Sequence, residues 1–346
     1  MLDDLKHIHQ IEVSDALGFA SKEPQQLLSN YETKIDLDPS MIRNVVYSGM
    51  GGSALAAILS QTWPGYRVPF EVVRNYQLPA YVNSSTLCIV SSASGNTEET
   101  LSSLEDAESK GARIVVIAGG GKLAEIAREK NYPLFMLPAS PQPRYGVFNN
   151  LKALVSIGSQ AEVFRDETRG VLEQAAQFLS SQVASWEATN PTTSNLAKQI
   201  ALDSLGKSVV IYGGPLMAPA AYKWKISFNE NAKQVAWYGV YSEFNHNEFI
   251  GWSSQPVDKP YLVIDLRSDK ELPRIQTRFQ LSQQLLSGRR PDPVVINASG
   301  SNVLEQLLYC VLLGDFTSIY AAIAAGTNPE PVELVEKFKQ LLAGNS

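Results

Sequence analysis

The sequence is poor in the residues that bind transition metals or form disulfides. It has two cysteines and three histidines in 346 residues. Cys88 and Cys310 lie in apolar runs, LCIV and LLYCVLL, which is typical of core thiols and not of a disulfide framework or a metal site. His7 and His9 lie in the N-terminal segment, so His246 is the one internal histidine. A His-rich zinc site is therefore excluded, and chemistry must rest on carboxylates, one histidine, Lys, Arg and backbone amides.

An excess of basic residues and a long uninterrupted apolar run are also missing. The formal net charge of −6 argues against the broad basic face of a general nucleic-acid binder. The longest apolar run, near 307–326, is interrupted by Asp315. Residues 1–20 carry early acids and no continuous apolar core, unlike a signal peptide. We therefore expect a soluble cytoplasmic protein with neither a nucleic-acid nor a membrane partner.

The composition predicts a protein with a sizeable core and about two domains, since 44% of the residues are apolar. In the first half, continuous apolar runs alternate with helical patterns. This alternation predicts a mostly parallel sheet with both faces covered by helices. The predicted strands are 45–50, 70–76, 86–92, 112–121 and 133–138.

The second half repeats this pattern after a change in composition. Residues 150–205 look helical, and ATNPTTSN (188–195) has the composition of a turn or linker. Further strands are predicted at 208–214, 261–266 and 293–299, and helices at 303–326 and 331–343. The fold class is therefore α/β, with two doubly wound domains and mostly parallel sheets. We expect an N-terminal domain over 1–150, a helical linker over 151–195 and a C-terminal domain over 196–346.

A glycine-rich turn, GMGGSA (49–54), joins the first predicted strand to its helix. It satisfies the G-x-G-x-x-G/A pattern of dinucleotide-binding folds, and Glu71 lies about 20 residues further on, where a ribose-binding acid is expected. However, Glu71 falls inside the second strand instead of at its end. A dinucleotide site and a tight turn without a ligand both remain alternatives to the interpretation that follows.

A second loop of this kind, SASGNT (92–97), also follows a strand and opens a helix. Two such loops can face each other at the carboxyl ends of neighbouring strands. Free N–H groups at helix N-termini and neutral hydroxyls suit phosphate oxygens. Neither loop has a lysine or the GxxxxGK[ST] motif, so the pair favours a sugar monophosphate over ATP. The alternative is an ordinary helix N-cap provided by Thr97 or Ser94.

These motifs resemble a known family. MGGSA followed about 40 residues later by SASGNTEET resembles the signature of the sugar isomerase (SIS) domain. FNENAK (228–233) and EFNHNE (243–248) are similar to segments of the bifunctional phosphoglucose/phosphomannose isomerase family. The resemblance implies two SIS-type domains and interconversion of glucose 6-phosphate, and also mannose 6-phosphate, with fructose 6-phosphate. The phosphate-binding residues that it implies are Gly51, Gly52, Ser53, Ser92, Ser94 and Thr97.

Such an isomerisation needs one base that moves a proton between C1 and C2, an acid/base group that opens the ring, and a cation near the oxyanion. It requires no metal or cofactor. The resemblance assigns the base to Glu230 and ring opening to His246, which the family takes from the neighbouring subunit of a homodimer. The alternatives are a surface pair of Glu230 with Lys233 and a hydrogen-bonded structural histidine.

Two cations complete the expected site. Arg144, in PQPRYGVF, resembles the family's P-x-R segment and would stabilise the enediolate; the alternative is a surface arginine. The family's C-terminal lysine matches Lys339, with Lys337 as the alternative. Two departures stand outside the proton-transfer chemistry: Ser242 replaces a usual proline and Ala93 a common aromatic residue.

Three other functions remain open on the sequence. One is a SIS regulator that binds a sugar phosphate without catalysis, which would not need Glu230, His246 and Lys339 together. Another is a SIS isomerase of a different sugar phosphate, such as an amino-sugar phosphate. The third is a nucleotide-binding oxidoreductase.

Overall fold

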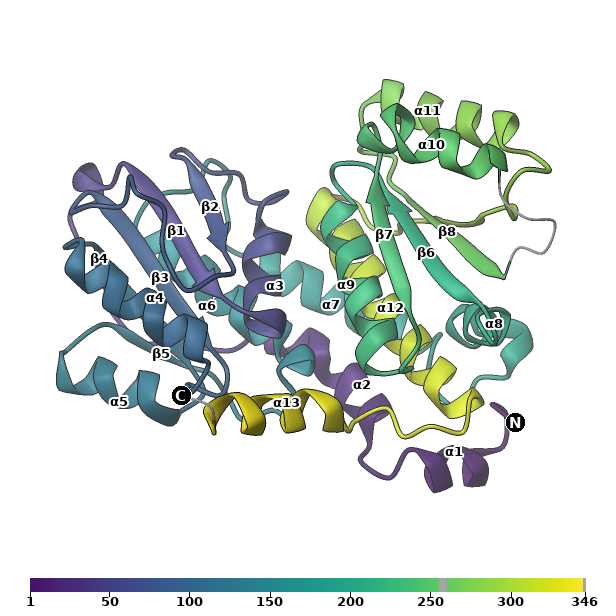
Figure 1. The fold of residues 1–346 in the computed structure, drawn as a ribbon, viewed down its shortest axis with the longest axis horizontal. Helices are drawn as coiled ribbons and strands as arrows, with labels where there is room; N and C mark the ends of the chain where they lie inside the picture. The colour runs from purple at the N-terminus through teal and green to yellow at the C-terminus, as the bar shows by residue number, and fades with distance from the viewer. Residues whose placement is uncertain (255–259, 345–346) are drawn as a thin grey trace. The chain divides into compact units, whose positions relative to one another are not determined.

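The computed structural model describes residues 1–254 and 260–344 and shows two compact α/β units. The N-terminal unit comprises Lys22–Ser180, and the C-terminal unit comprises Met1–Ser21 together with Ser181–Ser346. Each unit has its own parallel sheet with helices packed around it (Figure 1). The predicted fold class is confirmed.

The sheet of the N-terminal unit has the order β2-β1-β3-β4-β5, and its neighbouring strands are parallel. Every residue of β3 is buried, as expected for a central strand covered on both faces. The strands are β1 (Asn44–Gly49), β2 (Phe70–Val73), β3 (Thr86–Ser92), β4 (Arg113–Ala118) and β5 (Leu134–Met136).

A helix follows each of β1, β3 and β4 in this unit, whereas β2 leads to β3 without a helix, and α6 packs against α3. They are α3 (Gly51–Ser60), α4 (Glu98–Ser109), α5 (Gly121–Glu129), α6 (Val147–Gln160) and most of α7 (Val171–Val183), with short turns η1 (Pro39–Met41) and η2 (Pro143–Tyr145). Cys88 is fully buried, and burial raises the pKa of its thiol to about 12.

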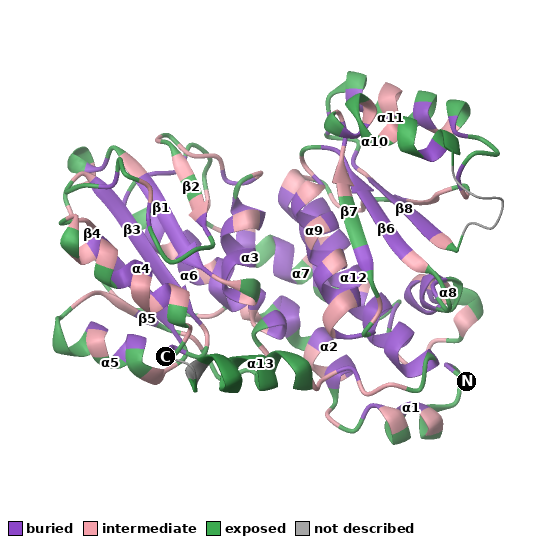
Figure 2. Ribbon diagram, viewed as in Figure 1, coloured by how far each residue is buried: buried purple, intermediate pink, exposed green. Residues whose placement is uncertain are grey.

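The sheet of the C-terminal unit has the order β7-β6-β8-β9, again with parallel neighbours. Its strands are β6 (Ser208–Gly213), β7 (Ala236–Val240), β8 (Tyr261–Arg267) and β9 (Val294–Asn297). The sequence analysis missed β7, which is an edge strand with exposed aromatic side chains at Trp237 and Tyr238 (Figure 2). Such a strand lacks the continuous buried run that identifies the others.

The helices of the C-terminal unit include one that is buried along nearly its whole length, α12 (Figure 2). It is the one helix of the described residues that is long and apolar enough to cross a membrane, and its apolar window is entirely buried, as in a core helix. The others are α1 (Leu5–Ile11), the first part of α2 (Ala16–Gln26), α8 (Leu196–Asp203), α9 (Ala218–Glu230), α10 (Glu248–Gly251), α11 (Pro273–Leu285), α12 (Val303–Ala324) and α13 (Glu333–Ala343), with short turns η3 (Thr192–Ser194), η4 (Glu243–His246) and η5 (Trp252–Ser254).

The contact boundaries of the units differ from the ranges expected from sequence. The first residues of the chain belong to the C-terminal unit, because Asp3 accepts hydrogen bonds from the Thr192 backbone N–H (2.8 Å) and the Lys198 ammonium group (3.1 Å). The N-terminal boundary therefore falls within α2 and not at residue 1. The segment 151–195, expected as a linker, contains most of α6 and all of α7, and the boundary at Ser180 lies inside it.

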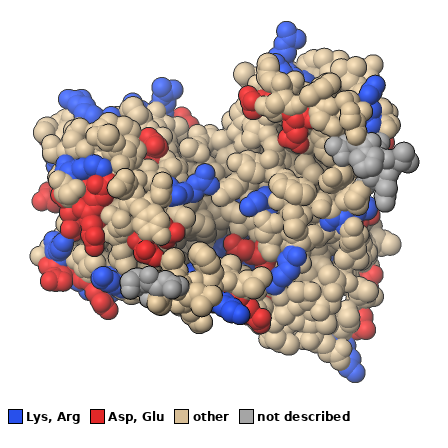
Figure 3. Space-filling model, in the orientation of Figure 1, with Lys and Arg blue, Asp and Glu red and all other residues tan. Residues whose placement is uncertain are grey.

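Charges of both signs are interspersed on the face of the molecule that Figure 3 shows. This distribution agrees with the net charge of −6 and the nearly equal numbers of basic and acidic residues, 29 and 35. It offers no support on that face for the basic stripe that nucleic-acid binding needs.

Candidate active site

The two loops GMGGSA (49–54) and SASGNT (92–97) meet at the carboxyl edge of the first sheet. Strands β1 and β3 are neighbours with Gly49 opposite Ser91, so the loops that follow them leave the sheet side by side. The Ala93 backbone N–H donates to Ser53 Oγ at 3.0 Å, which joins the second loop to the first. The structure thus brings together the loops that the sequence placed about 40 residues apart.

Three hydroxyls gather in the second loop. Ser92 Oγ lies 2.9 Å from Thr97 Oγ1 and 3.4 Å from Ser94 Oγ. Thr97 occupies the N-cap position of α4, yet among the described residues no backbone N–H donates a capping hydrogen bond to its side chain. The interpretation of Thr97 as an ordinary cap is therefore wrong. Hydroxyls beside a helix N-terminus form an arrangement that suits an anion.

A third loop, Gly119–Gly121 after β4, supports the second one. Gly95 has a positive φ of 71°, and a Cβ there would lie 1.7 Å from the Gly120 carbonyl oxygen. The Leu123 backbone N–H donates to the Gly95 carbonyl at 2.9 Å. Only glycines allow this close approach of the two backbones. The sequence analysis gave this loop no role, although the run AGGG directly after a strand was a usable signal.

A buried polar network under the loops was also missed. The Tyr47 hydroxyl shares its proton between Asn150 Oδ1 and the Ser53 carbonyl oxygen, each at 2.9 Å. The Asn150 amide donates to the Ser53 carbonyl oxygen and to Ser91 Oγ, each at 3.1 Å. Asn150 on α6 therefore connects the ends of both loops from below. The only hint in the sequence was an Asn-Asn pair next to apolar residues of the helix.

Arg144 lies on η2, which packs directly against the first loop. A Cβ on Gly52 would lie 2.8 Å from the Pro143 carbonyl carbon, so glycine is needed for this contact. Arg144 is 1% exposed and its guanidinium group lies 4.9 Å from the centre of the Tyr145 ring. The alternative of a surface arginine is therefore wrong. The turn η2 that carries Arg144 therefore lies against the first loop, in the same unit.

Glu71 does not serve the dinucleotide interpretation. It lies within β2 and not at the strand's end, and its carboxylate accepts a hydrogen bond from the Tyr81 hydroxyl at 2.6 Å. The G-x-G-x-x-A turn therefore lacks the acid at the strand end that ribose recognition uses.

In the C-terminal unit, Glu230 is the last residue of α9 and is half-buried. The Lys233 ammonium group donates to the main-chain carbonyls of Glu230 and Pro329, each at 2.8 Å. Lys233 has a positive φ of 54° and closes the end of the helix. The lysine of NENAK thus shapes the turn that carries Glu230, which is a structural role for a residue that we considered only as a surface partner.

His246 is presented by a short turn whose other side is anchored. Phe244 of η4 is buried, with its ring 4.7 Å from the Tyr212 ring centre, and Asn245 Nδ2 donates to Ser282 Oγ at 2.8 Å. His246 itself is exposed, and among the described residues no hydrogen bond to its side chain is found. This disfavours a structural histidine. The Tyr241–Ser242 peptide bond before this turn is cis.

Lys337 and Lys339 both lie on α13 and are exposed. Lys339 Nζ lies 2.9 Å from Glu336 Oε1, a surface ion pair of the i,i+3 kind that contributes little to stability. The geometry gives no preference between the two lysines. Glu230, His246 and these lysines therefore lie on three different elements of one unit, namely α9, η4 and α13.

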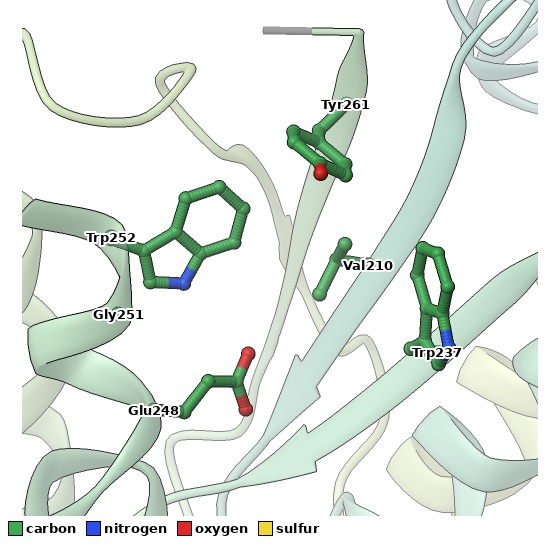
Figure 4. Close-up of a pocket in the computed structure, with 6 residues that line it drawn as sticks. All are labelled: Val210, Trp237, Glu248, Gly251, Trp252 and Tyr261. Atoms are coloured by element: carbon green, nitrogen blue, oxygen red, sulfur yellow. The ribbon is translucent and has the colours of Figure 1, made fainter. Parts of the chain in front are cut away.

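A pocket of about 210 Å³ lies elsewhere in the C-terminal unit. Figure 4 shows Glu248 pointing into it among aromatic side chains. It opens on the first half of the strands, since Tyr261 is the first residue of β8, whereas ligands of parallel sheets bind at the carboxyl ends. We therefore do not assign it to the active site. Its lining residues are Val210, Trp237, Glu248, Gly251, Trp252 and Tyr261.

Comparison with known proteins places the chain among sugar-phosphate enzymes. Residues 193–342 match the family model described as the bacterial phospho-glucose isomerase C-terminal SIS domain. A D-glucosamine-6-phosphate 4-epimerase from Sulfolobus acidocaldarius is 32% identical over 249 residues, covering 69% of this chain and 74% of that protein. Among solved structures, a glucose-6-phosphate isomerase-like protein from Thermus thermophilus superposes with a TM-score of 0.64 at 18% identity, covering 96% of this chain and 99% of that one.

Two further relatives cover nearly the whole chain. The bifunctional phosphoglucose/phosphomannose isomerase of Caldicellulosiruptor bescii is 33% identical over 92% of this chain and 96% of its own length. The protein of the same name from Aquifex aeolicus is 32% identical over 89% of this chain and 92% of its own length. The chain therefore belongs to the bifunctional phosphoglucose/phosphomannose isomerase family.

Proposed function

We propose that this protein interconverts glucose 6-phosphate with fructose 6-phosphate, and mannose 6-phosphate with fructose 6-phosphate, by proton transfer through an enediolate. The observation that carries the proposal is the joined pair of loops in the N-terminal unit, with its cluster of three hydroxyls. Family membership supports the reaction class.

The loops bind the phosphate group. Ser92, Ser94 and Thr97 provide hydroxyl donors, and Gly51, Gly52 and Ser53 belong to the turn that starts α3. The phosphate oxygens accept hydrogen bonds from these hydroxyls and from free N–H groups at the helix starts. No lysine or arginine belongs to either loop, so the phosphate is held by neutral donors alone. Binding by neutral donors suits a phosphate whose sugar must be released as product.

Glu230 takes the proton from C1 or C2 and returns it to the other carbon. A carboxylate serves in both directions because it can be base and acid in turn. Its place at the end of α9, fixed by Lys233, supports this role. Arg144 supplies the positive charge that stabilises the enediolate, and Lys339, or Lys337 in its place, assists at the ring oxygen.

His246 opens and closes the sugar ring, because an imidazole can both accept and donate a proton. We propose that it acts on the site of a second copy, in a cytoplasmic homodimer. Its exposure on η4 supports this, because an exposed side chain can reach another subunit. The test is complementation: Glu230→Gln and His246→Gln are each inactive alone and regain activity when co-expressed. Recovery fails if each site uses its own histidine.

The direct test of the reaction is an assay of the purified protein with fructose 6-phosphate in D2O. We expect aldose products that carry deuterium at C2, and a fall of about 10² to 10⁴ in turnover for Glu230→Gln, the scale of a positioned acid/base. Activity that survives EDTA is expected of a mechanism that needs no metal. Wild-type turnover in Glu230→Gln would overturn the assignment of the base.

One relative favours a second candidate function. The D-glucosamine-6-phosphate 4-epimerase matches more than two thirds of the chain at nearly the same identity as the isomerases. An amino-sugar phosphate is therefore the second substrate class to test. Nuclear magnetic resonance of the products separates the reactions, because 4-epimerisation inverts C4 and leaves C2 unchanged. The same spectra give the ratio of C2 epimers formed from fructose 6-phosphate. Tight binding of both substrates without exchange would instead indicate a non-catalytic regulator.

A further inference from the structure

A ladder of buried polar contacts joins α9 to α12 in the core of the C-terminal unit. Lys223 and Asp315 form an ion pair in which the side chains are 1% and 0% exposed. Ser227 Oγ donates to Asp315 Oδ1 at 2.7 Å, and Lys223 Nζ donates to Ser227 Oγ at 2.9 Å. One turn further along both helices, Asn231 Nδ2 donates to Ser318 Oγ at 2.9 Å.

The ladder leads to the proposed base. Residues 223, 227 and 231 follow one another at intervals of four and therefore lie on one face of α9. Glu230 is the last residue of that helix, beside the Asn231 rung. The helices α9 and α12 pack side by side (Figure 1), and their contacts advance in the same direction along both.

The surroundings of the ion pair are apolar. α12 is almost entirely buried, and on the same interface Trp224 lies so close to Gly314 that a Cβ there would be 2.4 Å from Trp224 Nε1. Among the described residues Asp315 Oδ2 has no hydrogen-bond partner. A pair of buried charges with an unsatisfied oxygen is a poor source of stability, because desolvation offsets the attraction. It does penalise every other alignment of the two helices, since a shifted register would leave both charges unpaired.

We propose that Lys223 and Asp315, with the Ser227 and Asn231–Ser318 rungs, are positioning residues that set the register of α9 on α12 and thereby hold Glu230 in its catalytic position. The inference rests on the proposed role of Glu230 as the base. Displacements of about 1 Å cost about 10²-fold in rate, so a small change of register is enough to matter.

The test separates register from stability. In the variant Lys223→Met with Asp315→Leu, both charges are replaced together by apolar groups, which is often neutral for stability. We expect a melting temperature within a few degrees of the wild type, a fall of about tenfold in kcat and in C2 exchange in D2O, and an unchanged KM and inhibition constant for inorganic phosphate. Ile319→Val, a buried change on the same helix outside the ladder, is the control. It lowers the melting temperature and leaves kcat unchanged.

A wild-type kcat in the folded double variant would overturn the proposal, and so would a fall that Ile319→Val reproduces. If the double variant does not fold, Ser318→Ala decides, because the rung beside Glu230 is the one contact of the ladder between α9 and α12 that it removes; the other bond it loses, to the Asp315 carbonyl, lies within α12. We expect a fall of several fold in kcat at constant KM, and a wild-type kcat there would equally overturn the ladder. Failure of the proposed function looks different, because the wild-type protein would then show no exchange on fructose 6-phosphate.

Discussion

In each unit the first strand of the sheet is followed by a glycine turn and a helix, β1 and α3 in the N-terminal unit and β6 and α9 in the C-terminal unit. The first turn is open to a ligand, whereas the second is occupied by a side chain of the protein. In the N-terminal unit the Ser53 backbone N–H donates to the Met50 carbonyl at 3.0 Å, and in the C-terminal unit the Met217 N–H donates to the Gly214 carbonyl at the same distance. The C-terminal turn is filled by its own chain. Glu271, from the loop after β8, accepts a hydrogen bond from the Leu216 N–H at 2.7 Å.

The difference shows how one architecture supports two tasks. The loop after β3 carries three hydroxyls and no carboxylate toward the first turn, so that turn remains available to an external anion. The equivalent loop after β8 supplies a buried carboxylate, and a Cβ on Gly214 would lie 2.4 Å from Glu271 Oε1. We infer that the N-terminal unit binds phosphate and supplies Arg144, and that the C-terminal unit supplies the groups that move protons, Glu230 and His246.

The largest expected effect concerns chemistry alone. His246→Gln should lower kcat by about 10² to 10⁴ because no other internal histidine can transfer the ring proton. The inhibition constant of inorganic phosphate should not change, since the phosphate loops belong to the other unit. Steady-state kinetics with phosphate as inhibitor checks both values. His9→Gln, an exposed histidine on α1, is the matched control and should match the wild type. A weakened phosphate affinity in His246→Gln would contradict the division of tasks.

A variant of the phosphate loops in the N-terminal unit should change KM and leave kcat nearly unchanged, the reverse of His246→Gln. Ser92→Ala removes the hydroxyl at the centre of the cluster, and a hydrogen bond to a charged group contributes about 1.5–3 kcal/mol. KM and the phosphate inhibition constant should therefore rise by about 10- to 100-fold, with kcat within a few fold of the wild type. The control is Ser103→Ala, which removes a hydroxyl bonded to the Asn75 carbonyl, away from the loops. A large loss of kcat at constant KM in Ser92→Ala would mean that this hydroxyl takes part in proton transfer and not in phosphate binding.

A smaller effect tests the support beneath the loops. Asn150→Ala leaves the buried Tyr47 and Ser91 hydroxyls with fewer partners, which should cost about 1–3 kcal/mol in the free energy of unfolding. It should also raise KM several fold, because the ends of both loops lose a shared contact. Denaturant unfolding and kinetics measure the two effects. Asn149→Ala, which loses a bond to Ser29 instead, should destabilise the unit without changing KM. Equal KM values in the two variants would show that Asn150 is not specific to the loops.

The sequence was informative where one local pattern determines the structure. The apolar runs of β3 and β8 and the glycine turns that follow the strands identified the sheets, because a strand covered on both faces must be apolar throughout. Neighbouring loops then followed from the parallel order. The meeting of the two loops was predictable for this reason, whereas their role in phosphate binding came from the resemblance and stays a prediction.

Contacts between distant residues could not be predicted in this way. Asn150 on α6 contacts Ser91 and Tyr47 on two strands that are far from it in the sequence. Asp315 likewise pairs with Lys223, which lies about 90 residues before it, so no local spacing reveals these contacts. The edge strand β7 was missed because only its first residue, Ala236, is buried, so it lacks the continuous buried run of the other strands. Glu271 was overlooked because its role depends on a turn that begins at Gly214.

The smallest expected effect comes from a variant that makes the C-terminal turn resemble the N-terminal one. Glu271→Ala empties the C-terminal turn and leaves the Leu216 N–H without its acceptor, so inorganic phosphate should occupy it weakly. A ligand bound at a second site adds RT ln(1 + [L]/Kd) to stability, and the melting temperature should therefore rise more steeply with phosphate than in the wild type. In Glu271→Gln the amide oxygen remains as acceptor, and the steeper rise should be absent. If the melting temperatures of the wild type, Glu271→Ala and Glu271→Gln rise equally with phosphate, the Glu271 side chain is not what keeps phosphate out of the C-terminal turn.

The Glu271 carboxylate should also make the stability of the C-terminal unit depend on pH. Burial raises the pKa of Glu271 above its ordinary 4.5, although the N–H groups of Leu216 and Met217 oppose the shift. The folded state therefore binds this proton more tightly than the unfolded state, and the resulting stability is complete below pH 4.5 and is lost as pH rises through the raised pKa. Glu271→Gln cannot ionise, so its free energy of unfolding should fall less over that range than that of the wild type in denaturant titrations at several pH values. A wild-type slope in Glu271→Gln would mean that the pKa of Glu271 is the same in the folded and unfolded states, because the pH dependence of stability comes only from the difference in proton binding between them.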